Sequence, residues 1–170
     1  MTAAITVRRI RAAEWEQLRT IRLQALADAP LAFSSNLAHE QAQPAAFWQE
    51  RAAGGATDEQ RATFIAERQG IWLGLVTCVR TTAGAGQRPA WVLGMWVNPT
   101  ARRQRVAQAL LRLLIAWARQ HEVDVLNLHV TSSNTSAIAL YQRLGFQATG
   151  TSRPLPHTPS MHENHMTYAL

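Results

Sequence analysis

The chain has 170 residues, of which 47% are hydrophobic and 16% charged, a size and composition typical of one globular domain that stays in solution. It contains no apolar run long enough to span a membrane and no secretory signal at its start, so we expect a cytoplasmic protein without membrane partners. Its 17 basic residues, all arginine, outnumber 11 acidic ones for a net charge of +6, but they form no aromatic-interleaved stripe, which argues against nucleic-acid binding.

The first half of the chain predicts a strand, two helices and an antiparallel meander of three strands. The expected elements are, in order, 5–10, 13–29, 44–53, 63–68, 71–79 and 90–97. Apolar side chains at three- and four-residue steps indicate the first helix, and Pro30 ends it. Residues 31–43 are expected to be irregular, Gly54 and Gly55 to stop the second helix, and 81–89 to form a glycine-containing loop.

The second half predicts alternating helices and strands. The expected elements are a helix at 106–121, a strand at 123–130, a helix capped by Asn134 and Gly145, a strand from Phe146 and a strand at 163–170. The strand 123–130 is apolar enough to be buried on both faces, which favours a parallel or central position. A proline-rich loop at 152–160 separates the last two strands. The order predicts an α/β fold with a mixed sheet and helices on its faces, in a single domain spanning 1–170 without an internal repeat or linker.

Three arginines stand where the helix at 106–121 begins, since Arg102, Arg103 and Arg105 precede Val106. A helix N-terminus already carries partial positive charge, so this placement is locally unfavourable unless an anion binds there. The arginines are therefore either simply solvated or placed to bind an anion. Outward N–H groups that lead into a helix, with guanidinium groups beside them, form a phosphate cradle. The chain has neither a Walker loop nor GxGxxG, so we expect a pyrophosphate that belongs to neither a nucleoside triphosphate nor a dinucleotide.

Two segments resemble the GNAT superfamily of acetyl-CoA-dependent N-acetyltransferases. Residues 102–107 (RRQRVA) follow its pyrophosphate pattern Gln/Arg-x-x-Gly-x-Gly/Ala, after a strand that ends in MWVNP. A later block of the same core matches at Leu128, Val130, Asn134, Ala137, Leu140, Tyr141, Gly145 and Phe146. One position departs, because Arg105 replaces the first glycine of the loop pattern. Arginine there either keeps the loop in a conformation open to every residue and adds a charge, or weakens the ligand site.

The resemblance implies a fold, a cosubstrate and a reaction. The fold is a mostly antiparallel central sheet whose parallel central pair splays around the cofactor, acetyl-CoA, with helices on both faces. An amine attacks the thioester directly, and backbone N–H groups of 95–97 stabilise the oxyanion. The residues implied to contact acetyl-CoA are Met95, Trp96, Val97, Arg102, Arg103, Gln104, Arg105, Val106, Ala107, Gln108, Asn134, Ala137 and Tyr141.

Three residues are candidates for catalysis. The resemblance places Tyr141 at the leaving thiolate, where a phenol of pKa about 10 can protonate a thiolate of pKa about 8.5; the alternative is an aromatic residue packed on the sheet. His129 stands where some members that acetylate protein N-termini use a histidine through water, and a pKa of about 6.5 suits a base; the alternative is a core histidine. Glu40 is another candidate base, an ammonium-binding carboxylate, or else a solvated helix cap.

The acceptor is predicted to be the primary amine of a small molecule. Phe33, Phe47, Trp48 and the loop 152–160 are candidates to line its pocket, although helix packing explains the aromatic residues equally well. A protein N-terminus is the alternative acceptor, which the LHV segment at 128–130 favours. A non-catalytic acyl-CoA-binding sensor is the other alternative, which the arginine in the loop pattern favours.

The histidines do not form a metal motif. The spacings of His39, His157, His162 and His165 fit neither HExxH nor a Cys/His finger, and such residues in loops usually have an ordinary surface role. We therefore expect no metal ion. The expected partners are acetyl-CoA and an amine, with a homodimer left open.

Overall fold

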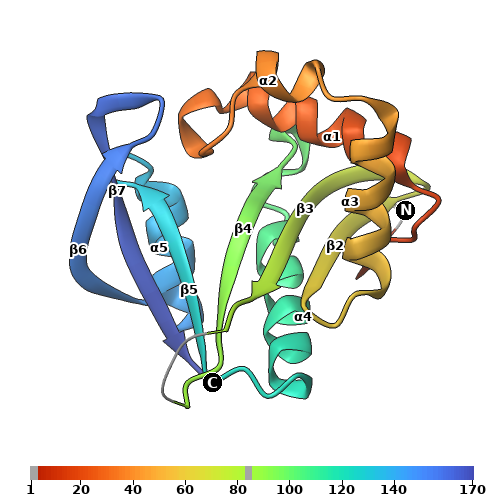
Figure 1. Ribbon diagram of the computed structural model, residues 1–170. Helices are drawn as coiled ribbons and strands as arrows, with labels where there is room; N and C mark the ends of the chain where they lie inside the picture. The colour runs from red at the N-terminus through yellow and green to blue at the C-terminus, as the bar shows by residue number, and fades with distance from the viewer. Residues whose placement is uncertain (1–3, 83–85) are drawn as a thin grey trace.

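The computed structural model describes residues 4–82 and 86–170, so the first three residues, and residues 83–85 of the expected loop 81–89, lie outside the described residues. The described strands form one sheet in the order β1-β2-β3-β4-β5-β7-β6 (Figure 1). The strands are β1 (Thr6–Arg9), β2 (Arg61–Arg68), β3 (Ile71–Arg80), β4 (Pro89–Val97), β5 (Val125–Thr131), β6 (Gln147–Leu155) and β7 (Thr158–Ala169). The helices are α1 (Trp15–Asp28), α2 (Leu37–Gln41), α3 (Ala45–Thr57), α4 (Val106–Gln120) and α5 (Thr135–Leu144), with short 3-10 helices η1 (Pro30–Ala32) and η2 (Pro99–Ala101).

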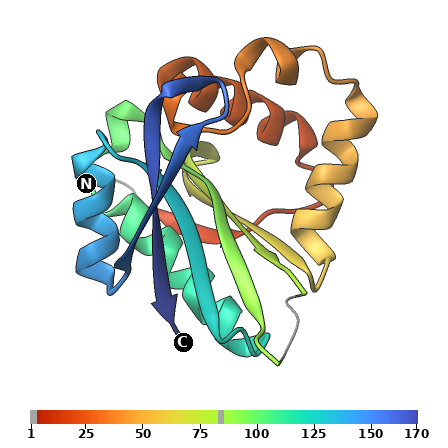
Figure 2. The same ribbon diagram turned by 60° about the vertical axis from the view of Figure 1, so that its left-hand side comes forward.

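Helices cover both faces of the sheet (Figures 1 and 2). On one face, α4 buries Leu110, Leu111 and Leu114 completely in a core shared with β2 to β5. On the other face, α1 and α3 bury Leu18 and Trp48 in a second core against β2 and β3. The predicted mixed α/β fold with helices on both faces is confirmed. None of the described helices is long and apolar enough to cross a membrane.

The two central strands, β4 and β5, are parallel and separate soon after they meet. They pair only where Pro89–Trp91 faces Val125–Asn127, although β4 continues to Val97 and β5 to Thr131. Figure 1 shows the two strands diverging beyond this short ladder. The splayed parallel pair that the resemblance implies is therefore present.

A β-bulge in β4 lies beside this opening. Leu93 pairs with Thr77 and Trp96 with Leu75, so Gly94 and Met95 together stand opposite a single residue of β3. Gly94 has φ 63°, a left-handed conformation that glycine adopts without the steric cost of a side chain. The bulge interrupts the regular β3–β4 ladder three residues beyond the last pair of β4 with β5.

Two expectations for the first half of the chain are wrong. The α3 helix continues through Gly54 and Gly55 to Thr57, and a Cβ on Gly55 would lie 2.6 Å from Thr63 Oγ1. The glycine is there to let α3 approach β2, and it does not stop the helix. The segment expected to be irregular contains η1 and α2, and Asn36 caps α2 by accepting a hydrogen bond from the His39 N–H at 2.9 Å.

Two expectations in the second half also fail. The proline-rich segment 152–160 is a hairpin of β6 and β7 and not a loop; Pro154 is tolerated because β6 lies at the edge of the sheet. The strand expected to be buried on both faces is buried on one, with Leu128 inside and His129 half-buried. Its central position, between β4 and β7, is as predicted.

Candidate active site

The N-terminus of α4 is open to an anion. Arg105 is its N-cap and makes no capping hydrogen bond, and within the described residues the N–H groups of Val106, Ala107 and Gln108 have no acceptor. Arg103 and Arg105 are exposed beside them. The partial positive charge of the helix start and two guanidinium groups therefore face solvent together, which suits a diphosphate.

Arg102 holds the connection between β4 and α4 in place. Its Nε donates to the Val97 carbonyl oxygen at 3.0 Å, and its Nη2 pairs with the Asp28 carboxylate at the end of α1. Asp28 also accepts from Trp96 Nε1 at 2.8 Å. The hydrogen bond from Trp96, and then the one from Arg102, lowers the pKa of Asp28. Both predicted ligand residues thus use their side chains to anchor the site, which leaves the backbone of Trp96 to contact a cosubstrate.

Gln104 ties the same segment to β2. Its Oε1 accepts from Arg68 Nη2 at 2.7 Å, and its Nε2 donates to the Thr100 carbonyl oxygen at 3.0 Å. The side chain of Gln104 is therefore engaged within the protein. Among the three arginines of this segment, Arg103 and Arg105 are exposed and make no side-chain hydrogen bond to a described residue.

The start of α5 has the cap that the sequence predicts. Asn134 Oδ1 accepts from the Ala137 N–H at 3.2 Å, and Gly145 ends the helix in the left-handed conformation with φ 107°. Asn134 is exposed, and its amide NH₂ group makes no hydrogen bond to a described residue. The side chain can therefore cap the helix and still donate to a ligand.

Tyr141 is buried on α5, with 7% of its surface exposed and its ring edge-on to Phe146 at 5.6 Å between centroids. Within the described residues its hydroxyl makes no hydrogen bond, whereas the hydroxyl of Tyr168 accepts from Arg119 Nη2 at 3.1 Å. Burial raises the pKa of Tyr141 above the ordinary value of 10. The phenol therefore keeps its proton at neutral pH and has that proton free to donate.

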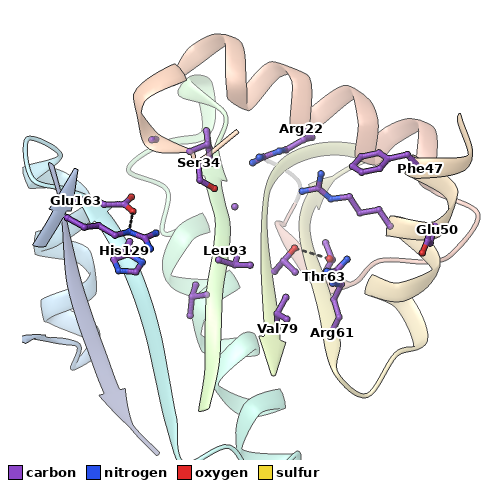
Figure 3. A pocket seen from close by; sticks show the side chains of 17 residues that line it. Arg22, Ser34, Phe47, Glu50, Arg61, Thr63, Val79, Leu93, His129 and Glu163 are labelled. Carbon is purple, nitrogen blue, oxygen red and sulfur yellow. Dashed lines mark hydrogen bonds and ion pairs between the residues drawn. The ribbon is translucent and has the colours of Figure 1, made fainter. Parts of the chain in front are cut away.

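A cavity of about 460 Å³ lies on the face of the sheet that carries α1 and α3 (Figure 3). Both halves of the chain line it, through residues that include Phe33, Phe47, Leu93, Gly94, His129, Arg153 and Glu163. Two of the predicted aromatic residues and the segment 152–160 therefore reach the cavity. Trp48 does not, because it is fully buried against Phe47 in the core beneath.

His129 enters the cavity from β5. Its ring stacks on Trp91 at 4.9 Å between centroids, and the ring of His165 lies 5.3 Å away. Burial, then the positive charge of Arg153, lowers the pKa of His129, and the opposing effect of Glu163 is smaller. The imidazole is therefore neutral at pH 7 and able to accept a proton.

Glu40 is a buried structural carboxylate. Arg22 approaches it with Nη2 2.7 Å from Oε1 and Nε 3.0 Å from Oε2, and Arg51 Nη1 lies 3.2 Å from Oε2. Glu40 is 4% exposed and does not line the cavity. The expectation of a solvated helix cap is wrong, and these contacts leave no free oxygen for an incoming ammonium group.

The sequence did not single out several charged residues that meet in the cavity: Arg22, Arg51, Arg61, Arg153 and Glu163. Glu163 is 8% exposed and accepts from Arg153 Nε at 2.7 Å. A signal for Glu163 was available, because in antiparallel strands His129 pairs with His165 and Thr131 with Glu163. Residues two apart on a strand share a face, so Glu163 and His129 project to the same side.

Two of the histidines considered as metal ligands form ordinary hydrogen bonds. His165 Nε2 lies 3.0 Å from Asn127 Oδ1, and a ring nitrogen of His157 lies 2.6 Å from the Ser34 carbonyl oxygen. Within residues 4–82 and 86–170, no group of three or more His, Cys, Asp or Glu residues is placed to hold a metal ion.

The geometry of this site agrees with a comparison of the chain with known families. The model of the Acetyltransferase (GNAT) family matches residues 15–146. The chain belongs to the GNAT acetyltransferase family. Among curated relatives, a ribosomal protein bS18-alanine N-acetyltransferase of Escherichia coli K12 is 36% identical over 81 residues, which are 48% of this chain and 55% of that protein. The chain spans about half the length of the curated relatives it matches, or less.

Solved GNAT structures share the fold over nearly the whole chain. A GNAT-family acetyltransferase from Streptococcus pneumoniae superposes with a TM-score of 0.82 and 16% identity, covering 98% of this chain and 99% of that one. An acetyltransferase from Salmonella typhimurium, solved with its cofactor acetyl-CoA, superposes with a TM-score of 0.75 and 18% identity over 99% and 95% of the two chains. At these identities the likeness concerns the fold.

The GNAT loop of this chain keeps the backbone shape of glycine at Arg105. The residue has φ 63° and ψ 16°, and Arg103 is also left-handed at φ 61°. A left-handed backbone costs a non-glycine residue about 1 kcal/mol or more. The expectation that arginine keeps the loop in a conformation open to every residue is therefore wrong.

We expect Arg105→Gly to leave the free energy of unfolding unchanged or to raise it by up to about 1 kcal/mol, because glycine adopts this conformation without strain but gains entropy on unfolding. Urea titration measures the change. Arg112→Gly is the matched control, since it lies exposed inside α4, and it should lower stability by about 1 kcal/mol. Equal losses at the two positions would contradict a left-handed Arg105.

Proposed function

We propose that this GNAT protein is an N-acetyltransferase that moves the acetyl group of acetyl-CoA to the primary amine of a small molecule, with residues 1–170 as a single domain. One observation carries the proposal. The pairing of β4 and β5 stops after Trp91 and Asn127; from there β4 leads to the open N-terminus of α4, while β5 carries His129 into a cavity on the other face. A donor anchored by its phosphates at α4 can place a thioester between the strands, where an amine in the cavity reaches it.

In a direct transfer of the acetyl group, each group of the site has one chemical role. His129 accepts a proton from the acceptor ammonium group, directly or through a water molecule, and the freed nitrogen bonds to the acetyl carbon. Backbone N–H groups of 95–97 donate to the carbonyl oxygen as it gains negative charge. Tyr141 donates its proton to the sulfur as the carbon–sulfur bond breaks, and the resulting tyrosinate is reprotonated by the second proton that the nitrogen loses as the amide forms. An amide and free CoA then leave the site.

His129 is the base in this proposal, in preference to Glu40. The imidazole borders the cavity and its lowered pKa leaves it unprotonated at pH 7. Burial alone would raise the pKa of Glu40, but Arg22 and Arg51 outweigh that effect and lower it. A carboxylate so strongly held by two guanidinium groups is a weak proton acceptor.

Two hydrogen bonds between the halves of the chain, beside the cavity, favour a small acceptor. The β6–β7 hairpin meets the segment after α1, where a ring nitrogen of His157 lies 2.6 Å from the Ser34 carbonyl oxygen. Thr131 Oγ1 donates to the Leu31 carbonyl oxygen at 2.8 Å on the same side. These contacts join the two halves of the chain beside the cavity, and we expect them to hinder the entry of a polypeptide.

A protein N-terminus is the second candidate acceptor. It is supported by the relative that acetylates an alanine of ribosomal protein bS18 and by the position of His129 in an LHV segment. A sensor that binds acyl-CoA without turnover is the third candidate, and the guanidinium group of Arg105 at the phosphate loop is the feature that favours it.

A screen of acceptors that reports free CoA separates the three candidates. Small amines and peptides are incubated with acetyl-CoA, and the released thiol is measured, while the melting temperature is followed with and without acetyl-CoA. Turnover of small amines supports the proposal, and turnover of peptides alone favours a protein N-terminus. A rise in melting temperature with no turnover of any acceptor favours the sensor.

The rate should depend on pH through His129. The imidazole must be unprotonated to act as a base, and its pKa is lowered from 6.5, so kcat/KM should rise with pH along a limb whose midpoint lies below 6.5. His129→Gln should flatten this limb. His121→Gln is the control, because His121 stacks on Trp117 away from the cavity, and it should keep the limb. An acidic limb that survives in His129→Gln would exclude His129 as the base.

A further inference from the structure

The far end of the cavity carries positive charge that the proposed reaction does not use. Figure 3 shows His129 and Glu163 at one end and Glu50 and Arg61 at the other, with Leu93 between them. The end with His129 is the one that faces the opening between β4 and β5. The other end is built by α1, α3 and β2, and has no part in proton transfer.

Three guanidinium groups line that far end, from Arg22, Arg51 and Arg61. Arg22 and Arg51 share the single carboxylate of Glu40, at 2.7 Å and 3.2 Å. Among the described residues, no carboxylate lies within 4.0 Å of the Arg61 guanidinium group. The far end therefore has three guanidinium groups and one buried carboxylate, which pairs with two of them.

Neighbouring charged groups do not neutralise the excess positive charge at the far end of the cavity. Burial, and then repulsion from Arg22 and from Arg61, lowers the pKa of Arg51 despite the attraction of Glu40. Glu50 borders the same end, but it is exposed and makes no ion pair with a described residue, so solvent screens its charge. At the reacting end, by contrast, Arg153 is neutralised by Glu163 at 2.7 Å.

We propose that the acceptor is a small primary amine that also carries a carboxylate group, with its amine at His129 and its carboxylate at Arg51 and Arg61. The inference rests on the proposed acetyltransferase function and names its substrate class. Guanidinium groups bind carboxylates through paired, charge-assisted hydrogen bonds. A carboxylate at this place supplies the negative charge that the far end lacks, and a cavity of about 460 Å³ suits a molecule of this size.

The test compares acceptors that differ only in the charge of the remote group. Straight-chain ω-amino acids with three to six carbons are compared with the corresponding carboxamides and with diamines of the same length, and free CoA is measured. For the chain length that fits, kcat/KM for the acid should exceed that for the carboxamide by about 10- to 100-fold, and the diamine should be poorer still. Equal rates for acid and carboxamide would overturn the inference while leaving the acetyltransferase proposal intact.

Two variants and a binding measurement complete the test. Arg61→Gln should bring the ratio of acid to carboxamide close to one, because it removes a guanidinium group that favours the acid. Arg19→Gln, on the exposed side of α1 outside the cavity, should keep the ratio. Calorimetry measures the binding of the same ω-amino acids in the presence of CoA and separates the two proposals. If the ω-amino acids bind, Arg61→Gln abolishes the binding and no turnover occurs, the carboxylate site is supported and the acetyltransferase proposal is overturned. Absence of both binding and turnover overturns both.

Discussion

Replacing Glu40 with alanine should lower the free energy of unfolding by about 3–5 kcal/mol, because it leaves the buried Arg22 guanidinium group without its partner. Arg22 is 6% exposed and Glu40 4%, so water does not take the place of the lost carboxylate. Urea titration at pH 7 measures the effect. Glu50→Ala, at an exposed position of α3, should change stability by no more than about 0.5 kcal/mol.

A second variant tests whether the loss comes from the unpaired charge. The double substitution Arg22→Met and Glu40→Leu removes both charges and should recover most of the stability lost in Glu40→Ala. A loss below about 1 kcal/mol in Glu40→Ala would show that the pair is not buried as described.

The same ion pair makes the stability of the native protein depend on pH in the acid range. Because the pKa of Glu40 is lowered from 4.5, the stability that its ionised form contributes is complete above pH 4.5 and disappears as the pH falls through the lowered pKa.

Tyr141→Phe should reduce kcat by about 100-fold or more, with little change in the KM for acetyl-CoA, because it removes the proton donor for the departing thiolate and nothing else. The ring stays in place against Phe146, and the hydroxyl makes no hydrogen bond to a described residue, so the melting temperature should barely move. Steady-state kinetics with an acceptor from the screen gives kcat and KM, and thermal unfolding gives the stability.

The control for this substitution is the other tyrosine of the chain. Tyr168→Phe removes a hydroxyl that accepts from Arg119 at the surface, and it should leave kcat unchanged. If Tyr141→Phe keeps the full rate, another group must protonate the sulfur. If it loses rate and stability together, Tyr141 acts through packing and not as an acid.

Patterns among residues near in sequence predicted several helices, helix caps and strands correctly. The 3.6-residue period of α4, the caps Asn134 and Gly145 of α5, and the meander of β2, β3 and β4 all follow from residues near in sequence. The Asn36 cap of α2 was a local signal that the prediction missed, and other errors arose where distant residues decide. Gly55 reads as a helix stop until Thr63 is known to lie against it, and Pro154 reads as a loop residue until β6 is known to be an edge strand.

Most of the residues predicted to contact acetyl-CoA stand in one continuous segment, 95–108, where local pattern can single them out, and their role stays a prediction. The acceptor side could not be singled out in this way, because its charges come from α1, α3, β2, β6 and β7, and only the packing of these elements brings them together. Glu40 shows the difficulty most clearly. Nothing in its neighbourhood along the chain indicates that Arg22, 18 residues earlier, will bury it and occupy both of its oxygens.

The α1 helix touches both halves of the site. Arg22, in the middle of the helix, lines the cavity. Asp28, at the end of the helix, binds Arg102 and Trp96 beside the start of α4. The two contacts are about 9 Å apart along a single stiff rod, at 1.5 Å for each residue. One helix therefore fixes both the Arg102 anchor at the start of α4 and the part of the cavity that Arg22 lines.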